Sequence, residues 1–233
     1  MSSRCLRILA AFVCMAPLVA FSSICEQLEG QDQFDEKDRI TSDYFSDYFI
    51  SKRNDVYFVL AVKRVSADAD QSMDVLDDLE RHAEFLPNYN QICVLRLKAG
   101  EVYTGIRFQA WIFESRFTNS VEISRSRTNY RQCWNQIRRD DRMIVEKYQS
   151  APTANQGYWR IQTIDGKNIE LRYFAIIQPP IEVPLLYYHT LKNTYEKVFQ
   201  AVLDRIHDSS KHTDTGQNSP ECAQLQRTRP EEK

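Results

Sequence analysis

The 233-residue sequence predicts an α+β fold in which a curved antiparallel β-sheet wraps around one long C-terminal α-helix. Two observations predict this fold. Residues 184–207 carry apolar side chains at spacings of three and four, which is the period of an amphipathic helix. Nearly all of residues 55–178 instead reads as β-strands separated by turns. One helix after a set of strands is expected to bury its apolar stripe against the sheet.

The predicted C-terminal helix has an aromatic stripe. Pro184 suits its first turn, where a missing N–H has no cost. The stripe consists of Tyr188, Leu191, Tyr195, Val198, Val202 and Ile206. Such a stripe is either ordinary core packing or one wall of an apolar ligand cavity between helix and sheet.

The N-terminal segment has the pattern of a secretory signal. Arg4 and Arg7 precede 14 uncharged residues, 8–21, and Ala20 and Ser22 place small side chains before a cleavage point after residue 22. The run is shorter than the about 20 apolar residues that a membrane span needs. The sequence therefore predicts a cleaved signal peptide over residues 1–22 and a secreted or periplasmic protein, with an uncleaved membrane anchor as the alternative. The bulky Ile24 argues against lipidation of the next cysteine.

Two polar segments flank the predicted domain, which spans residues 53–208. Residues 26–47 hold eight carboxylates, so residues 23–52 are expected to form an acidic, mostly disordered leader. Within it, Asp-Tyr-Phe occurs at 43–45 and again at 47–49, and this offset of four favours a short helix. Residues 209–233 are expected to be a disordered polar tail.

The strands follow in order along the domain. In the first, residues 55–65, alternation places Val56, Phe58, Leu60 and Val62 on one face. Residues 72–82 are predicted to be helical. Asp165-Gly166 between two β-rich arms is a strong hairpin signal. The remaining strands are expected over residues 91–98, 102–117, 121–134, 143–148, 158–164 and 167–178.

Cleavage after residue 22 would leave four cysteines: Cys25, Cys93, Cys133 and Cys222. Four cysteines in an oxidising compartment allow three disulfide connectivities. Because Cys93 and Cys133 lie in strand-like sequence, we interpret them as small buried hydrophobic side chains.

Two stretches of the sequence resemble a known family. In residues 73–96, Asp78 precedes Phe85-Leu86-Pro87, and near the C-terminus Trp159 opens a hairpin that leads to Pro179 and the closing helix. These patterns resemble the START-like polyketide cyclase and coenzyme Q-binding (SRPBCC) proteins over residues 55–206, outside the arginine-rich residues 117–142. The resemblance implies a helix-grip fold with an apolar cavity for a lipid, quinone or polyketide.

The expected ligand contacts are aromatic and aliphatic side chains from the strands and the closing helix: Phe58, Leu60, Phe108, Trp159, Tyr173, Tyr188 and Tyr195. Trp111 is a further candidate, although a regular strand places it opposite Phe108. Tyrosine hydroxyls can hydrogen-bond a ligand carbonyl. Each of these residues is otherwise an ordinary core residue.

The only basic stretch runs from Arg125 to Arg142. Arg125, Arg127 and Arg131 suggest a weak site for a polyanion or a lipid headgroup. The alternative is a solvated strand face that neighbouring carboxylates neutralise. The formal charge of −2 gives no general attraction to nucleic acid, so none is expected as a partner.

Motifs for chemistry are lacking in the sequence: it has no HExxH, CxxC, GxSxG or phosphate-binding glycine loop, so no metal or cofactor is expected. His82 is interpreted as a solvated residue, and His189 as helix surface or a ligand-orienting group. The sequence thus predicts an exported binding module for a hydrophobic small molecule, with a membrane surface as a further partner. A cyclase- or dehydratase-like enzyme is the alternative, and the oligomeric state is open.

Overall fold

The structure, a computed structural model, describes residues 23–97, 100–110, 113–138, 151–179, 186–208 and 222. The strands are β1 (Asp47–Arg53), β2 (Val56–Ser66), β3 (Tyr89–Arg96), β4 (Val102–Ala110), β5 (Phe113–Arg125), β6 (Asn129–Ile137), β7 (Ala154–Asp165) and β8 (Asn168–Gln178). The helices are α1 (Ile24–Leu28), α2 (Ala69–Asp77), α3 (His82–Phe85) and α4 (Leu186–His207), with short 3-10 turns η1 (Glu36–Asp38) and η2 (Leu79–Arg81).

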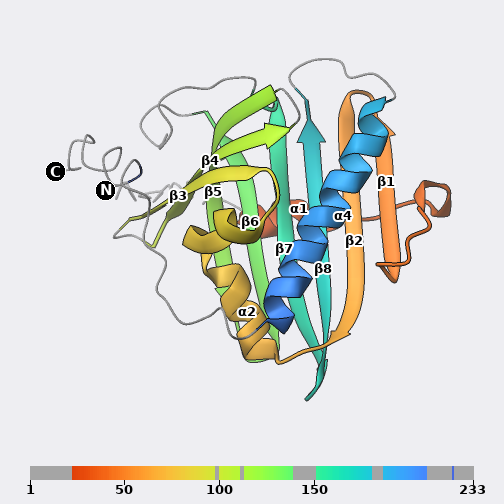
Figure 1. The fold of residues 1–233 in the computed structure, drawn as a ribbon, viewed down its shortest axis with the longest axis vertical. Coiled ribbons are helices and arrows are strands. Elements are labelled where there is room, and N and C mark those ends of the chain that lie inside the picture. Colours follow the sequence, from red (N-terminus) through yellow and green to blue (C-terminus); the bar gives the residue numbers. More distant parts are fainter. Residues whose placement is uncertain are drawn as a thin grey trace, which may run out of the picture.

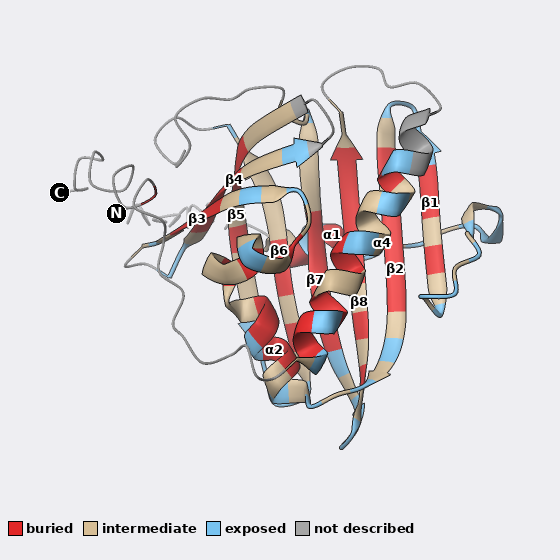
Figure 2. Ribbon diagram, viewed as in Figure 1, coloured by how far each residue is buried: buried red, intermediate tan, exposed pale blue. Residues whose placement is uncertain are grey.

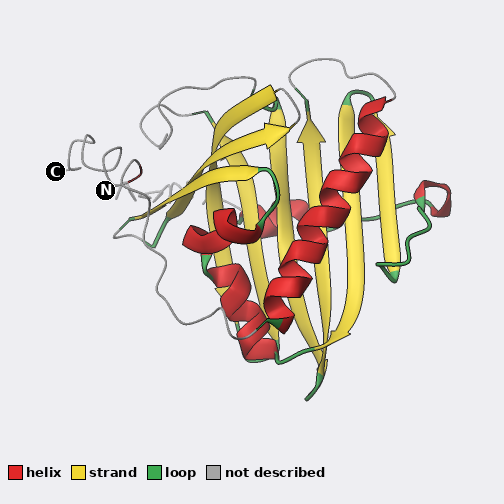
Figure 3. Cartoon of the chain, viewed as in Figure 1, coloured by secondary structure: helices red, strands yellow, loops and turns green. Residues whose placement is uncertain are grey.

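The strands form one eight-stranded antiparallel sheet in the order β1-β2-β8-β7-β6-β5-β4-β3. The sheet curves around α4, which crosses it together with α2 on the same side (Figures 1 and 3). This arrangement confirms the predicted fold class. We call the sheet face toward α4 the inner face and the opposite one the outer face.

The inner face and α4 enclose the main core. Of the predicted apolar stripe of α4, Leu191 and the three residues Val198, Val202 and Ile206 are buried, the last three with 4%, 1% and 3% exposed, and Tyr195 is partly buried (Figure 2). Opposite them, Val59, Ile161 and Leu171 are fully buried on β2, β7 and β8. The helix is therefore held by apolar burial along its length, each enclosed side chain contributing about 1.5–3 kcal/mol.

The outer face is covered by the N-terminal segment. Leu28 of α1 is 1% exposed and packs with Leu60 and Phe174. The Ile24 N–H donates to a carboxylate oxygen of Glu122 at 2.8 Å. The expectation of a mostly disordered leader over residues 23–52 is therefore wrong. Its few apolar side chains pack on the apolar outer face of the sheet, and a disulfide attaches it there.

Two disulfides tie the terminal segments to the sheet. Cys25 pairs with Cys133 on β6, and Cys93 on β3 pairs with Cys222, with Cα–Cα distances of 5.4 and 5.3 Å. The prediction that Cys93 and Cys133 are buried is correct, but their interpretation as unpaired hydrophobic side chains is wrong. Their partners lie in segments whose polar composition gave no sign of packing against the sheet.

Three local predictions differ from the structure. The short helix expected at 43–49 is not formed: residues 43–46 are irregular and 47–49 begin β1. Tyr48 and Ile50 of β1 alternate into the core, because pairing with β2 outweighs local helix preference. The strand predicted over 102–117 is two strands, since β4 ends at Ala110 and β5 begins at Phe113. The strand predicted at 121–134 is interrupted by a turn in which the Ser126 hydroxyl accepts the Asn129 N–H at 3.2 Å.

The hairpin at Asp165-Gly166 is confirmed, and Asp165 Oδ1 accepts the backbone N–H groups of Lys167 and Asn168 at 2.9 and 3.0 Å. The predicted strand at 143–148 and the signal peptide at 1–22 lie outside the described residues, as does the tail after residue 208 except Cys222. Within the described part, no helix has the length and apolarity to cross a membrane. There is likewise no group of metal-ligating side chains among these residues.

Candidate functional site

Five aromatic side chains meet between the inner face and α4. We call Trp134, Trp159, Tyr173, Tyr195 and Phe199 the aromatic cluster. The Tyr173 ring lies at its centre, 4.5 Å from Trp159, 5.7 Å from Trp134 and 5.5 Å from Tyr195 between ring centroids. The antiparallel register produces this grouping, because Trp159 on β7 is directly opposite Tyr173 on β8.

Trp134 is positioned by a glycine and a hydrogen bond. Gly157 stands opposite it on β7, and a Cβ there would lie 2.6 Å from Cζ2 of the indole, so only glycine lets the ring approach the strand this closely. The indole Nε1–H donates to Asn155 Oδ1 at 3.1 Å. Both contacts fix the ring plane that stacks on Tyr173.

The hydroxyls of Tyr173 and Tyr89 are held in their neutral form. Burial, followed by the neighbouring Tyr195 and Tyr89, raises the pKa of Tyr173 well above its usual range. Burial also raises the pKa of Tyr89 to about 12. Tyr48 donates its hydroxyl to the backbone carbonyl of Lys192 on α4 at 3.1 Å. These groups can donate and accept hydrogen bonds near neutral pH, but they are not suited to abstract protons.

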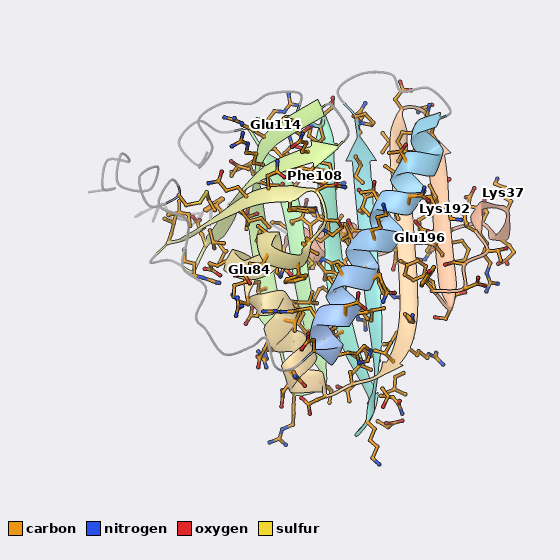
Figure 4. The ribbon with its side chains drawn as sticks, in the orientation of Figure 1. Lys37, Glu84, Phe108, Glu114, Lys192 and Glu196 are labelled. Atoms are coloured by element: carbon orange, nitrogen blue, oxygen red, sulfur yellow. A yellow bond between two sulfur atoms is a disulfide. The ribbon has the colours of Figure 1, made fainter. Side chains whose placement is uncertain are left out.

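Phe108 lies on β4, next to the edge strand β3, whereas Lys192 and Glu196 lie on α4 (Figure 4). Its ring contacts Tyr89 at 5.3 Å in an edge-on arrangement. Tyr89 packs against both the main core and the second apolar cluster, which contains Ile106 and Phe117. Phe108 is thus an inner-face residue, as predicted, but it belongs to a neighbouring cluster and is not packed on Trp159.

Two predicted ligand contacts lie on the wrong face. Leu60 and Phe58 belong to the outer cluster beneath the N-terminal segment, and the Arg53 guanidinium lies 5.3 Å from the Phe58 ring. Their β2 neighbours Val59 and Ala61 occupy the inner face instead. Alternation separates the two faces of a strand but does not say which one meets the helix when both are apolar.

The structure therefore brings together Trp159, Tyr173 and Tyr195 of the predicted contacts. The side chains of Tyr188 and His189 and the whole of Trp111 lie outside the described residues. Trp134 and Tyr89 were not among the predicted contacts. The pattern of β6 did not indicate Trp134, because the residues two positions away on the same face are the polar Gln132 and Gln136.

The predicted anion site is largely occupied by the chain's own carboxylates. Arg125 donates to Asp74 at 2.6 Å, and this hydrogen bond is the main reason that its pKa is raised. Arg131 donates to Glu29 at 2.6 Å. Arg127 is exposed in the turn after β5. The first two arginines thus attach α2 and the N-terminal segment to the sheet, which matches the neutralised strand face better than a polyanion site.

His82 is not the solvated residue that its sequence neighbours suggested. It is 6% exposed, its Nε2 lies 3.2 Å from the carbonyl oxygen of Val75, and burial lowers its pKa to about 4. His82 is therefore a neutral packing residue between α2 and α3 at neutral pH.

Comparison with known proteins identifies the fold. No family model matches the sequence, and no curated protein matches it either. Among solved structures, a STAR-related lipid transfer protein of Xanthomonas axonopodis superposes with a TM-score of 0.62 at 14% identity, covering 73% of this chain and 98% of that one. Human StAR-related lipid transfer protein 5 gives a TM-score of 0.61 at 8% identity, with coverages of 81% and 95%.

A third similar structure is the Zhui aromatase/cyclase from Streptomyces sp. R1128, with a TM-score of 0.53, 15% identity and coverages of 67% and 97%. At such identities these similarities bear on the fold alone. The chain has a START-like helix-grip fold, as the resemblance in its sequence implied.

Proposed function

We propose that this START-like domain binds a hydrophobic small molecule, of the lipid, quinone or polyketide type, between the inner face of its sheet and α4. The observation that carries the proposal is the aromatic cluster, in which Trp134, Trp159 and Tyr195 surround Tyr173 at ring distances of 4.5–5.7 Å. Two structures with this fold are named for lipid transfer and a third for an aromatase/cyclase, which supports an apolar ligand.

The cluster supplies what such a ligand needs. Aromatic rings present a large apolar contact area that loses little conformational entropy on binding, because each ring is already fixed by its neighbours. The hydroxyls of Tyr173 and Tyr195 add polar atoms within an apolar surface. A few placed polar groups in an apolar lining are the usual composition of a small-molecule site.

Binding without chemistry accounts best for the titratable groups. Three buried groups have pKa values far from pH 7 and are therefore neutral at that pH. The pKa is raised for Tyr89 and Tyr173 and lowered for His82. A general acid or base works best with a pKa near the operating pH. Turnover of a polyketide-like substrate is the second candidate, since the aromatase/cyclase shares the fold.

We also propose that the protein acts outside the cytosol, where it would take up or release its ligand at a membrane surface. The disulfides Cys25–Cys133 and Cys93–Cys222 support this, because such bonds persist mainly in oxidising compartments. N-terminal sequencing of protein from its own host should give a start near Ser23. An intact Met1 on a cytosolic protein with free thiols would contradict export.

Displacement of an apolar fluorophore tests ligand binding. Tyr195→Ala should weaken binding of the fluorophore about 5- to 150-fold, since about 1–3 kcal/mol of aromatic contact is removed. Phe58→Ala is the matched control: it truncates an aromatic side chain of the outer face that a ligand beneath α4 does not touch. Equal effects of the two variants at equal stability would contradict the site.

A further inference from the structure

A row of polar side chains crosses the inner face beside the aromatic cluster. Thr104, Asn119 and Gln136 are in register on β4, β5 and β6, each directly opposite the next. Asn119 stands between Phe117 and Val121, which pack in the second apolar cluster, so alternation places it on the inner face. Thr104 is 4% and Asn119 3% exposed. Amide and hydroxyl groups thus stand side by side at one level of the inner face.

Two acceptors of this row have no hydrogen-bond partner in the described structure. They are Asn119 Oδ1 and Gln136 Oε1, and both atoms are buried. The orientation of the Gln136 amide is fixed, because its Nε2 donates to the carbonyl oxygen of Pro152 at 2.9 Å. The next amide, on Asn155, already accepts the Trp134 indole N–H. A buried acceptor without a donor costs about 1–3 kcal/mol, so a donor from outside the described residues would stabilise the two amides.

The position of these acceptors relates them to the proposed ligand. Gln136 follows Trp134 by two residues on β6, so both side chains point to the inner face, and Trp134 stacks on Tyr173. Asn119 is the cross-strand neighbour of Gln136. A molecule resting on the aromatic cluster would therefore reach the two amides with one end.

We infer that Asn119 and Gln136 form the polar end of the apolar site and accept hydrogen bonds from a neutral donor, a hydroxyl or an amide N–H, on an otherwise apolar ligand. This inference rests on the proposed function. A carboxylate or a phosphate offers acceptors only and would face two more acceptors. A buried ammonium would need a carboxylate, and the row holds only amides and a hydroxyl. Hydroxylated or amide-bearing lipids and polycyclic alcohols fit the row.

The experiment compares pairs of molecules that differ only in the donor. Cetyl alcohol and its methyl ether, and naphthol and its methyl ether, would compete with an apolar fluorophore for the mature, disulfide-intact protein. The alcohols should bind about two- to tenfold more tightly than the ethers, because the single hydroxyl hydrogen gains one hydrogen bond of about 0.5–1.5 kcal/mol to one of the two amide oxygens.

Asn119→Leu and Gln136→Met each remove one acceptor and keep the side-chain volume. Because one hydroxyl can donate to either amide, each variant should reduce the preference for the alcohol only in part. The double variant Asn119→Leu/Gln136→Met should abolish the preference and leave binding of the ether within about twofold. Thr163→Val is the matched control. It removes another buried inner-face oxygen without a partner, near the opposite end of β7, and should leave the preference unchanged.

The outcomes separate the inference from the function on which it rests. If alcohol and ether bind equally to the unaltered protein, an ordered water satisfies the amides and the inference is wrong, although binding stands. If the preference survives in the double variant, the donor is recognised elsewhere and the inference is also wrong. If neither pair displaces the fluorophore, the proposed function itself is contradicted.

Discussion

Of two side chains on α4, we expect truncation of the smaller one, Val202, to cost more stability than truncation of the larger one, Tyr195. Val202 is 1% exposed and enclosed by the main core, so Val202→Ala removes two methyl groups from a closed environment. At about 0.8 kcal/mol per methyl plus a cavity term, the cost is about 2 kcal/mol. In a domain of this size that lowers the melting temperature by about 4–8 °C.

Tyr195→Ala removes more atoms but should cost less. The Tyr195 ring is only partly buried and borders the region that we assign to the ligand, so its loss leaves less unfilled space than that of Val202. Thermal unfolding followed by circular dichroism would compare both variants, with the exposed Lys197→Ala as a control for helix propensity. If Tyr195→Ala unfolds the domain and Val202→Ala is mild, this part of α4 is only a core element and the reasoning fails.

Three further predictions concern stability. His82 has a pKa of about 4 in the folded protein and 6.5 in the unfolded chain. The free energy of unfolding should therefore be highest above pH 6.5 and fall by about 3 kcal/mol as the pH drops to 4. Urea titrations at several pH values should show this decrease, and the His82→Gln variant should not show it. Gly157→Ala should destabilise by about 1–3 kcal/mol, because the added methyl meets Trp134 and the Ala175 backbone, and an unchanged melting temperature would contradict the close packing. Replacing Cys25 and Cys133 together by serine should cost roughly 2–5 kcal/mol, since the bridge closes a separation of 108 residues; urea midpoints would measure it, and a change under 1 kcal/mol would mean that the anchor is dispensable.

Local signals in the sequence predicted much of the fold. The stripe of Val198, Val202 and Ile206 follows from helix periodicity, and the turn at Asp165-Gly166 follows from turn chemistry. Both depend on residues close together in the chain, where sequence patterns carry direct physical information.

The errors arose where distant segments meet. Phe58 and Leu60 were assigned to the inner face because the covering of the outer face by residues near Leu28 could not be seen in β2 itself. The same covering explains the wrong expectation for the leader. The unpartnered amides of Asn119 and Gln136 are recognisable only through the cross-strand register, which the sequence of either strand alone does not specify.

Native mass spectrometry of the disulfide-intact protein from its own host tests the central claim most directly. We predict a mass above that of the polypeptide, which mild activation returns to the polypeptide mass by releasing one apolar small molecule. The Tyr195→Ala protein should carry less of this molecule, and the Phe58→Ala protein as much as the unaltered chain. Protein that is consistently empty and does not take up an apolar fluorophore would contradict the account.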